Sequence, residues 1–429
     1  MSQAIAATNC SQRELLLALW AAGLCAADIC GKYDAFLPAP PSGRTIVIGA
    51  GKGAAAMARE FDAIWQGPLH GLVVTRHGYG LPDYAGRIEV IEAGHPVPDR
   101  ASVEAARRMV ELVSGLHADD LVIALISGGA SALLVGLPEG VQLEDKQALT
   151  RQLLACGAPI SDINVVRKAI STIKGGKLAR LAAPARVVTF AVSDIPGDDI
   201  GAVGSGPTIE EDASPNEALN ILHRYAIAIP PAIERYLLAT RPPDSVPARS
   251  SVEGDGHLVV TPAGSLAAAA REAESAGYEA IVLGDALEGE ARELGAAHAR
   301  LALDLQQRHK RACLISGGET TVTLQGKGRG GRNTEYLLGL ALALQGQEGI
   351  TALAGDTDGI DGSEDNAGAM VFPSSLARAR QLGVDARQSL DNNDTYSFFK
   401  ALDDLLVTGP TYTNVNDLRI ILVDQPIAL

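Results

Sequence analysis

Short apolar runs that alternate with longer helical patterns are the feature that most constrains the fold of this 429-residue chain. Each run has the length of a buried strand, and the segments between the runs have the spacing of amphipathic helices. This alternation predicts an α/β protein with largely parallel sheets and helices on both faces. The expected strands are 45–49, 71–75, 121–126 and 187–192 in the first half, and 258–261, 280–283, 312–315 and 350–354 in the second.

The chain is too long for one core of ordinary size, so two domains are expected. The segment at 241–251 is rich in Pro and Ser and lacks periodicity, which is typical of a linker. We therefore expect an N-terminal α/β domain over 1–240 and a C-terminal α/β domain over 252–429.

Charge and cysteine usage exclude several classes of protein. A formal net charge of −15 argues against a nucleic-acid-binding or anionic-membrane surface. The five cysteines are scattered, which favours free thiols in a reducing compartment and hence a cytoplasmic protein. The apolar run at 15–27 could be the core of a signal peptide, but Arg13 and Glu14 precede it. Since Ser11 and Glu14 also fit a capping box, a buried N-terminal helix is the better interpretation.

Glycine-rich turns follow strands in both halves of the chain. The sequence LISGG occurs at 125–129 and again at 314–318. Ligands of open α/β sheets bind at the carboxyl ends of strands, so a cleft lined by both halves is expected. The segment at 49–54, GAGKGA, matches the GxGxxA pattern of a dinucleotide-binding turn. Its Lys52 suits a phosphoryl group or a carboxylate, although an ordinary solvent-facing lysine is an open alternative.

A nicotinamide cofactor is less well supported than an anion site. The strand at 71–75 ends in Arg76, where an Asp or Glu would bind the ribose of NAD. Arg76 could instead bind the 2′-phosphate of NADP. The eight histidines are dispersed, and the sequence shows no His–carboxylate pair for hydride transfer.

Two further segments could bind anions. Ser127-Gly128-Gly129-Ala130-Ser131 is a candidate phosphate nest, with a simple tight turn as the alternative. A basic helix is expected over 163–181, where the seven-residue spacing of Arg167 and Lys174 would place both on one face. Such a cluster in an acidic chain suggests an anionic ligand, while a solvated helix face remains the alternative.

Acidic residues end two of the expected strands. Asp194 follows the strand at 187–192, and Asp356 follows the strand at 350–354, with Asp358 close behind. Carboxylates at strand ends suit Mg²⁺, which often takes only one or two of them together with phosphate and water. Arg332 follows a glycine run and could stabilise charge on a transferring phosphoryl group.

Taken together, these segments resemble the bacterial glycerate 2-kinases, whose C-terminal half is the MOFRL domain. The matching segments are 49–58, 94–99, 127–134, 163–179, 192–208, 316–335, 354–362, 392–399 and 408–420. They span nearly the whole chain. Two residues depart from the usual family sequence, because Ala130 and Tyr412 stand where the family usually has glycine.

The resemblance implies a Rossmann-like N-terminal domain, a distinct C-terminal α/β domain and an active-site cleft between them. It implies phosphorylation of D-glycerate at the 2-hydroxyl by ATP with Mg²⁺, and it makes Lys52 and Arg332 essential. Hydroxypyruvate reductase is the alternative activity, since family members have often carried that name. A non-catalytic sensor of sugar acids or nucleotides is a third alternative, and a homodimer is left open.

The residues expected in the site fall into four groups. The catalytic residues are Lys52, Arg332 and Asp194. The nucleotide and phosphate ligands are Gly49, Gly51, Ser127, Gly128, Gly129, Ala130, Ser131 and Glu319. The substrate ligands are Arg167, Lys174 and Asn333. The metal ligands are Asp356 and Asp358.

Overall fold

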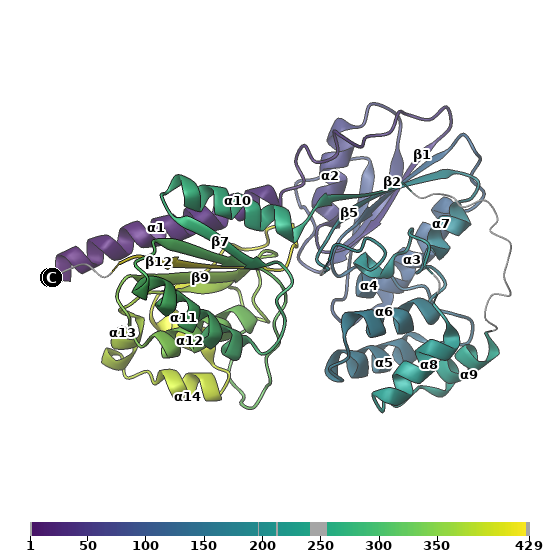
Figure 1. Ribbon diagram of the computed structural model, residues 1–429. Helices are drawn as coiled ribbons and strands as arrows, with labels where there is room; N and C mark the ends of the chain where they lie inside the picture. The colour runs from purple at the N-terminus through teal and green to yellow at the C-terminus, as the bar shows by residue number, and fades with distance from the viewer. Residues whose placement is uncertain (1, 196, 212, 241–254, 426–429) are drawn as a thin grey trace. The chain divides into compact units, whose positions relative to one another are not determined.

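The computed structural model describes residues 2–195, 197–211, 213–240 and 255–425. The chain forms two compact units, each with its own six-stranded sheet (Figure 1). The parallel-sheet unit comprises Ile29–Val259, and the mixed-sheet unit comprises Met1–Asp28 together with Val260–Leu429. The protein is therefore of the α/β class, as the alternation of strands and helices predicts.

The parallel-sheet unit has the strand order β3-β2-β1-β4-β5-β6. Its strands are β1 (Thr45–Ala50), β2 (His70–Arg76), β3 (Ile88–Ala93), β4 (Leu121–Ile126), β5 (Arg186–Val192) and β6 (Asp255–Val260). β1 pairs in parallel with both β2 and β4, so the order reverses between β1 and β4. This sheet confirms the expected Rossmann-like fold, and its switch point lies at the carboxyl ends of β1 and β4.

Helices cover both faces of this sheet. The helices of this unit are α2 (Ala54–Ile64), α3 (Arg100–Val113), α4 (Ala130–Leu133), α5 (Leu143–Ala155), α6 (Ile160–Ala169), α7 (Lys177–Ala182), α8 (Pro215–Arg224) and α9 (Pro231–Ala239), with a 3-10 turn, η1, at Val203–Ser205. On one face, Met109 of α3 packs with Ile46 and Ile48 of β1. On the other face, Phe61 of α2 contacts Phe190 of β5. Burial of β1 on both faces explains its continuous apolar sequence.

A second, smaller core lies among α5, α6, α8 and α9. The expected single basic helix over 163–181 is wrong, because α6 ends at Ala169 and α7 begins at Lys177. Gly175 and Gly176 between them have φ of +63° and +76°, a conformation that glycine adopts readily and that interrupts a helix. Arg167 and Lys174 therefore do not share a helix face.

The mixed-sheet unit has the strand order β11-β10-β9-β12-β8-β7. Its strands are β7 (Glu279–Gly284), β8 (Ala312–Ser316), β9 (Ile350–Asp356), β10 (Gly368–Val371), β11 (Leu405–Leu406) and β12 (Asp417–Val423). The expectation of a largely parallel sheet is wrong here. β12 lies between β9 and β8 and runs antiparallel to both, whereas β7 and β8 are parallel.

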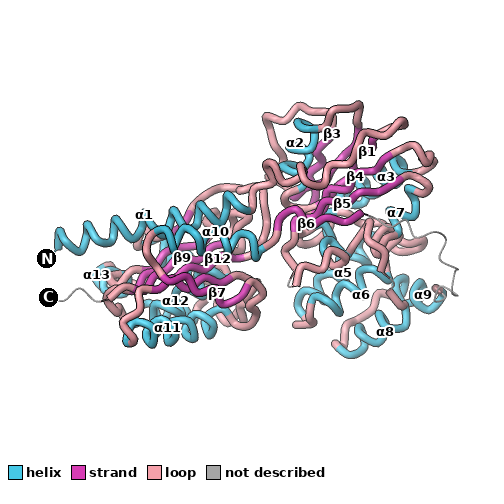
Figure 2. Tube along the Cα trace, turned by 45° about the horizontal axis from the view of Figure 1, so that its top comes forward, coloured by secondary structure: helices cyan, strands magenta, loops and turns pink. Residues whose placement is uncertain are grey.

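Helices also cover both faces of the mixed sheet, as Figure 2 shows. They are α1 (Ser2–Ala26), α10 (Pro262–Ser275), α11 (Ala291–Gln307), α12 (Arg332–Leu344), α13 (Ser375–Gln381), α14 (Ala386–Asp391) and α15 (Thr395–Ala401). α1 and α10 cover one face, where Leu16 and Leu266 pack with Ile420 of β12. α11 and α12 cover the other face, where Leu337 packs with Ile421. The expected N-terminal helix is thus a structural helix of this unit. In the described residues, no helix has both the length and the hydropathy needed to cross a bilayer.

The two units differ from the expected domain boundaries. α1 belongs to the mixed-sheet unit, and β6 completes the parallel sheet, so the chain passes between the units after Asp28 and again after Val259. The strand expected at 258–261 therefore joins the first sheet and not the second. The linker expected at 241–251 lies outside the described residues.

Candidate active site

The turn after β1 places Lys52 at the switch point of the parallel sheet. Gly51 has φ of +138°, and a Cβ atom there would lie 2.1 Å from Ser127 Oγ, so this position requires glycine. The N–H of Lys52 donates to the carbonyl of Gly128 at 2.8 Å, and the N–H of Gly53 donates to Ser127 Oγ at 3.0 Å. The turns after β1 and β4 are therefore locked together by hydrogen bonds.

The same bonds bear on the dinucleotide interpretation of GAGKGA. In a dinucleotide-binding turn, the first N–H groups of the helix point at the pyrophosphate. Here the N–H groups of Lys52, Gly53 and Ala54 all donate within the protein, the last to the carbonyl of Gly51 at 3.1 Å. Gly49 serves strand packing, because a Cβ atom there would lie 2.4 Å from the carbonyl oxygen of Leu125.

The Ser127–Ser131 turn contacts residues from three other segments. Gly129 has φ of +83°, and a Cβ atom there would lie 3.0 Å from His95 Nε2 and 3.3 Å from Lys52 Cγ. Ser131 Oγ lies 2.7 Å from Ser205 Oγ, which in turn donates to Asn164 Oδ1. The imidazole of His95 is therefore a site neighbour that the sequence did not single out, because its proline-rich segment indicated only a rigid turn.

Three of the expected residues, Asp194, Arg167 and Lys174, lie near the carboxyl edge of the parallel sheet. Asp194 follows β5, and its charge acts on Arg167 of α6. Lys174 lies between α6 and α7, where its Nζ donates to the carbonyl of Gly204 at 3.3 Å. Since Gly204 precedes Ser205, the structure brings Lys174 close to the Ser127–Ser131 turn even though the predicted helix face is absent.

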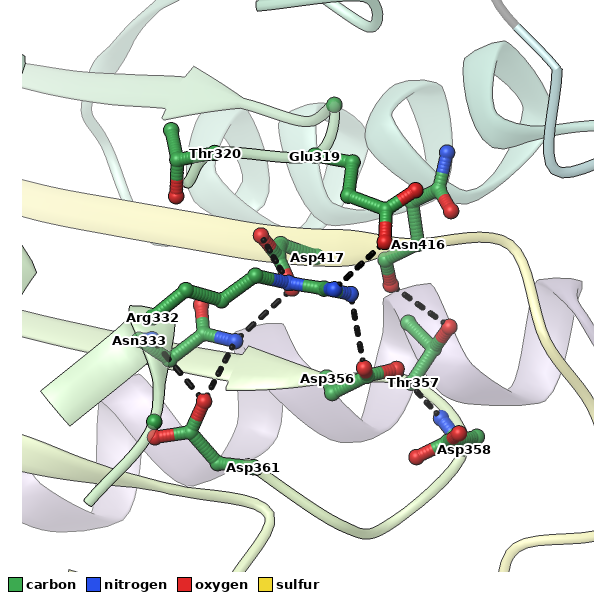
Figure 3. A network of polar contacts seen from close by, with 12 residues as sticks. Glu319, Thr320, Arg332, Asn333, Asp356, Thr357, Asp358, Asp361, Asn416 and Asp417 are labelled. Carbon is green, nitrogen blue, oxygen red and sulfur yellow. Dashed lines mark hydrogen bonds and ion pairs between the residues drawn. The ribbon is translucent and has the colours of Figure 1, made fainter. Parts of the chain in front are cut away.

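In the mixed-sheet unit, Arg332 begins α12 and is held by three carboxylates (Figure 3). Its Nε donates to Asp417 Oδ1 at 2.8 Å, and its terminal nitrogens donate to Glu319 at 2.6 Å and Asp356 at 2.8 Å. Burial alone would lower the pKa of Arg332, but Asp417, Glu319 and Asp356 outweigh it and raise the pKa well above its usual value. The guanidinium has five N–H donors, so two remain for a ligand, and the side chain is 22% exposed.

Asp417 and Arg419 are central to this network, although the sequence pattern indicates a role for neither. Asp417 is fully buried at the start of β12, where it also accepts from Asn333 Nδ2 at 2.7 Å and from Arg419. Arg419 is equally buried and donates to the carbonyls of Gly317 and Gly318. The second LISGG turn is therefore fixed by an arginine from the C-terminal strand.

Asn333 and Asp361 position the start of α12. Asp361 accepts from the N–H groups of Asn333 and Thr334, each at 2.9 Å, and this cap fixes the first turn of the helix. Burial raises the pKa of Asp361, and these hydrogen bonds oppose the rise. Asn333 Oδ1 is buried and has no hydrogen-bond partner among the described residues. A buried orphan acceptor beside Arg332 is consistent with the expected substrate role of Asn333.

The expected Mg²⁺ ligands lie in the same network. Asp356 Oδ1 accepts from the N–H of Asp358, and Asp358 Oδ1 accepts from the N–H of Ile360. Among the described residues, no group of three acidic, histidine or cysteine side chains is placed to hold a metal ion by itself. Carboxylates nevertheless outnumber arginines here, and Mg²⁺ in phosphate sites often has only one or two protein ligands. The donor set therefore fits a magnesium ion that is bound mainly through phosphate and water.

Comparison with known proteins identifies the family. Residues 16–238 match a domain of unknown function, DUF4147, and residues 312–417 match the MOFRL family. A D-glycerate 2-kinase from Thermotoga maritima is 38% identical over 388 residues, which cover 89% of this chain and 91% of that protein. The chain belongs to the DUF4147/MOFRL glycerate kinase family. The crystal structure of glycerate kinase from Thermotoga maritima matches with a TM-score of 0.84 and 36% identity, covering 96% of this chain and 99% of that one.

Family members carry two kinds of name. A protein from Agrobacterium vitis named "Putative hydroxypyruvate reductase" is 49% identical over 420 residues, covering 96% of this chain and 95% of that protein. Membership of the glycerate kinase family therefore leaves two activities to be compared.

The structure also locates the two departures from the usual family sequence. Tyr412 has φ of +61°, the left-handed region in which glycine carries no steric cost. Ala130 is the first residue of α4, and its Cβ lies where a side chain at Gly204 would collide with it. The alanine thus fits because position 204 is glycine.

Proposed function

We propose that this chain transfers the γ-phosphoryl group of ATP to the 2-hydroxyl of D-glycerate, which yields 2-phosphoglycerate and ADP. Relatives named D-glycerate 2-kinase and glycerate 2-kinase match over most of their length and support this activity. The turn after β1 is the observation that carries the proposal. The N–H groups that would bind a dinucleotide donate within the protein, and the turn presents a lysine at the switch point.

Positioning and charge neutralisation account for most of the catalysis of phosphoryl transfer. In the proposed mechanism, Lys52 and Arg332 stabilise negative charge on the phosphoryl group as it moves to the acceptor oxygen. Arg332 suits this role, since three of its donors are fixed by carboxylates and two remain for phosphate oxygens. Its fixed orientation costs no reorganisation when the charge develops.

The other predicted residues bind and orient the reactants. Asp194 accepts or orients the proton of the 2-hydroxyl, and the Ser127–Ser131 turn binds phosphate oxygens. Asp356 and Asp358 would hold Mg²⁺ together with the phosphates of ATP, and Glu319 keeps Arg332 in place. Magnesium would neutralise phosphate charge, which the carboxylate-rich network cannot do on its own.

Hydroxypyruvate reductase is the second candidate, because it is the name of the Agrobacterium vitis relatives. It requires bound NADH or NADPH and a proton donor to the carbonyl. The two activities are separated by incubating the protein with D-glycerate, ATP and Mg²⁺, and separately with hydroxypyruvate and NADH or NADPH. Formation of ADP only when glycerate is present supports the kinase. Loss of NADH or NADPH without ADP formation would show that the chain is a reductase.

Replacing Lys52 with alanine tests the proposed site. We expect turnover to fall by at least about a thousandfold, since a positioned cation at the phosphoryl group is lost. The melting temperature should stay near that of the wild type, because the backbone bonds of the turn do not need this side chain. Lys310→Ala is the matched control, since Lys310 is exposed and pairs only with Glu279 among the described residues. Turnover retained by Lys52→Ala would reject the assignment.

A further inference from the structure

In the parallel-sheet unit, two buried lysines and one partly buried arginine have no ion-pair partner among the described residues. They are Lys146 of α5, Arg167 of α6 and Lys174, which precedes α7. Lys146 is 4% exposed and Lys174 is 1% exposed. Among the described residues, no carboxylate lies within ion-pairing distance of any of the three. Asp194 is the carboxylate whose charge acts on Arg167 from farther away.

The hydrogen bonds of the two lysines are also weak. Lys146 Nζ donates to the carbonyl of Ile170 at 3.5 Å, and Lys174 Nζ donates to the carbonyl of Gly204 at 3.3 Å. Both distances are long for a charged donor, whose bonds to oxygen are usually about 2.7–2.9 Å. Two neighbouring cations in the same unit are different, because Lys168 pairs with Glu211 and Arg180 pairs with Glu210. Lys177 has no carboxylate partner among the described residues either, but its Nζ donates to the carbonyls of Lys168 and Ser171.

Grouping unpaired cations in a protein interior is unfavourable. Burial lowers the pKa of Lys146 to about 7, and the charges of Arg167 and Lys177 lower it further. Burial also lowers the pKa of Lys174 well below its usual value, with Lys146 and Arg167 contributing. Side chains that carry such a cost are typical of sites whose ligand supplies the missing charge.

The cations lie beside the proposed substrate site. Lys174 contacts Gly204, and the next residue, Ser205, bonds to Ser131 of the turn after β4. Arg167 responds to the charge of Asp194, which follows β5. The cluster is thus continuous with the carboxyl edge of the parallel sheet, where ligands of this fold bind.

We propose that Lys146, Arg167 and Lys174 form one anion-binding pocket that takes the carboxylate of a small hydroxy or oxo acid. The proposal deepens the proposed function, because glycerate and hydroxypyruvate share this carboxylate. Arg167 can bind a carboxylate through two parallel hydrogen bonds, while each lysine supplies a point charge. Lys146 is the new member, since its place in the sequence predicted no role for it.

Binding of a carboxylate is then coupled to protonation of the pocket. The groups that act on Lys146 are Arg167 of α6 and Lys177 of α7, with Lys174 between these helices and Asp194 after β5. A bound anion favours the charged form of a lysine and raises its pKa, so binding takes up protons above about pH 7. Affinity should therefore fall as the pH rises, by up to about tenfold per pH unit for each linked proton.

Calorimetric titration with D-glycerate, in the absence of nucleotide, tests the pocket in the wild type and in Lys146→Met. We expect the variant to bind about tenfold to a hundredfold more weakly at pH 7, since a charge-assisted hydrogen bond is lost. Its affinity should also depend less on pH between 6.5 and 8.5. The affinity for ADP should stay within about twofold of the wild type. Hydroxypyruvate is the second probe and should show the same loss.

Lys168→Met is the matched control, because Lys168 is an equally buried lysine of α6 that has a carboxylate partner. It should reduce stability and leave glycerate affinity unchanged. Lys174→Met is measured in the same way and keeps the proposal testable if Lys146→Met does not fold. Unchanged glycerate affinity in folded Lys146→Met or Lys174→Met would overturn the pocket. Loss of ADP affinity with glycerate affinity retained would overturn its assignment to a carboxylate.

The proposed pocket and the proposed kinase activity can be rejected independently of each other. If wild-type protein binds glycerate, loses that binding in Lys146→Met and yet forms no ADP, the pocket is supported and the kinase proposal fails. If wild-type protein forms ADP while Lys146→Met binds glycerate normally, the kinase is supported and the pocket is rejected.

Discussion

At the scale of single residues, the buried ammonium of Lys146 should make stability depend on pH. Its pKa is about 7 in the folded protein, compared with 10.5 for an ordinary lysine. Between these values the unfolded chain holds a proton that the folded chain lacks, so stability rises with pH across this window. Below about pH 7 both states are protonated, and the destabilisation is at its largest and constant. At pH 6–7 we therefore expect Lys146→Met to be more stable than the wild type by a few kcal/mol. This is the order of the free energy that corresponds to the shift in the pKa of Lys146.

The difference between the two proteins should shrink as the pH rises from 7 towards 10. Urea midpoints measured at several pH values give this difference directly, and other titrating groups cancel in the comparison. Lys310→Ala should show a difference from the wild type that does not change with pH. A constant difference for Lys146→Met would mean that its amine is not buried in the folded protein.

Candidate residues could be chosen from the sequence where the side chain lies in a recognisable turn. Lys52 stands out because it lies inside a glycine-rich turn before a helix, and Arg332 because it follows a glycine run at the start of a helix. Lys146 could not be found in this way, since a lysine among polar residues on a helix usually faces solvent. Asp417 was missed because its partners Arg332 and Asn333 are more than 80 residues away in the sequence.

At the scale of elements, the interlocked turns after β1 and β4 predict a severe effect of Gly51→Ala. Alanine would be strained at φ of +138°, and its Cβ would collide with Ser127 Oγ. We expect a loss of about 2–4 kcal/mol in the free energy of unfolding, together with loss of turnover, because Lys52 is displaced. Urea denaturation and the ADP assay measure the two effects.

Gly140→Ala is the control for this substitution. Gly140 has φ of +79°, and a Cβ atom there would meet nothing within 4 Å. Its cost should be limited to about 1 kcal/mol of backbone strain, with turnover unchanged. Equal effects at both positions would show that the turns are not locked as the structure indicates.

The elements of the parallel-sheet unit were more predictable than those of the mixed-sheet unit. In the first unit, helices follow β1, β3 and β4, and such crossovers allow the strands to be parallel, whereas β2 leads to β3 without a helix. In the second unit, β10 and β12 were not expected, and β12 pairs with strands that precede it by more than 60 residues. The apolar pattern of a strand gives its burial but not its partners or direction, so the mixed sheet could not be derived from the sequence.

At the scale of the whole molecule, the chain divides its candidate residues between two units. Lys52, Asp194 and the cationic pocket belong to the parallel-sheet unit, whereas Arg332 and the carboxylates belong to the mixed-sheet unit. The sequence predicted that both halves serve one reaction, because each contains a glycine-rich turn at a strand end. This prediction concerns function, and kinetics can test it.

Residues that stabilise the same transition state give non-additive losses when both are removed. If Lys52 and Arg332 act on one phosphoryl group, Lys52→Ala and Arg332→Ala should each abolish most turnover. The double variant should then lose little more than either single variant. Rates of ADP formation for the four proteins provide the double-mutant cycle, and melting temperatures show that each is folded. Losses that multiply in the double variant would indicate that the two residues contribute independently, and the proposal that they act as a unit on one phosphoryl group would then be wrong.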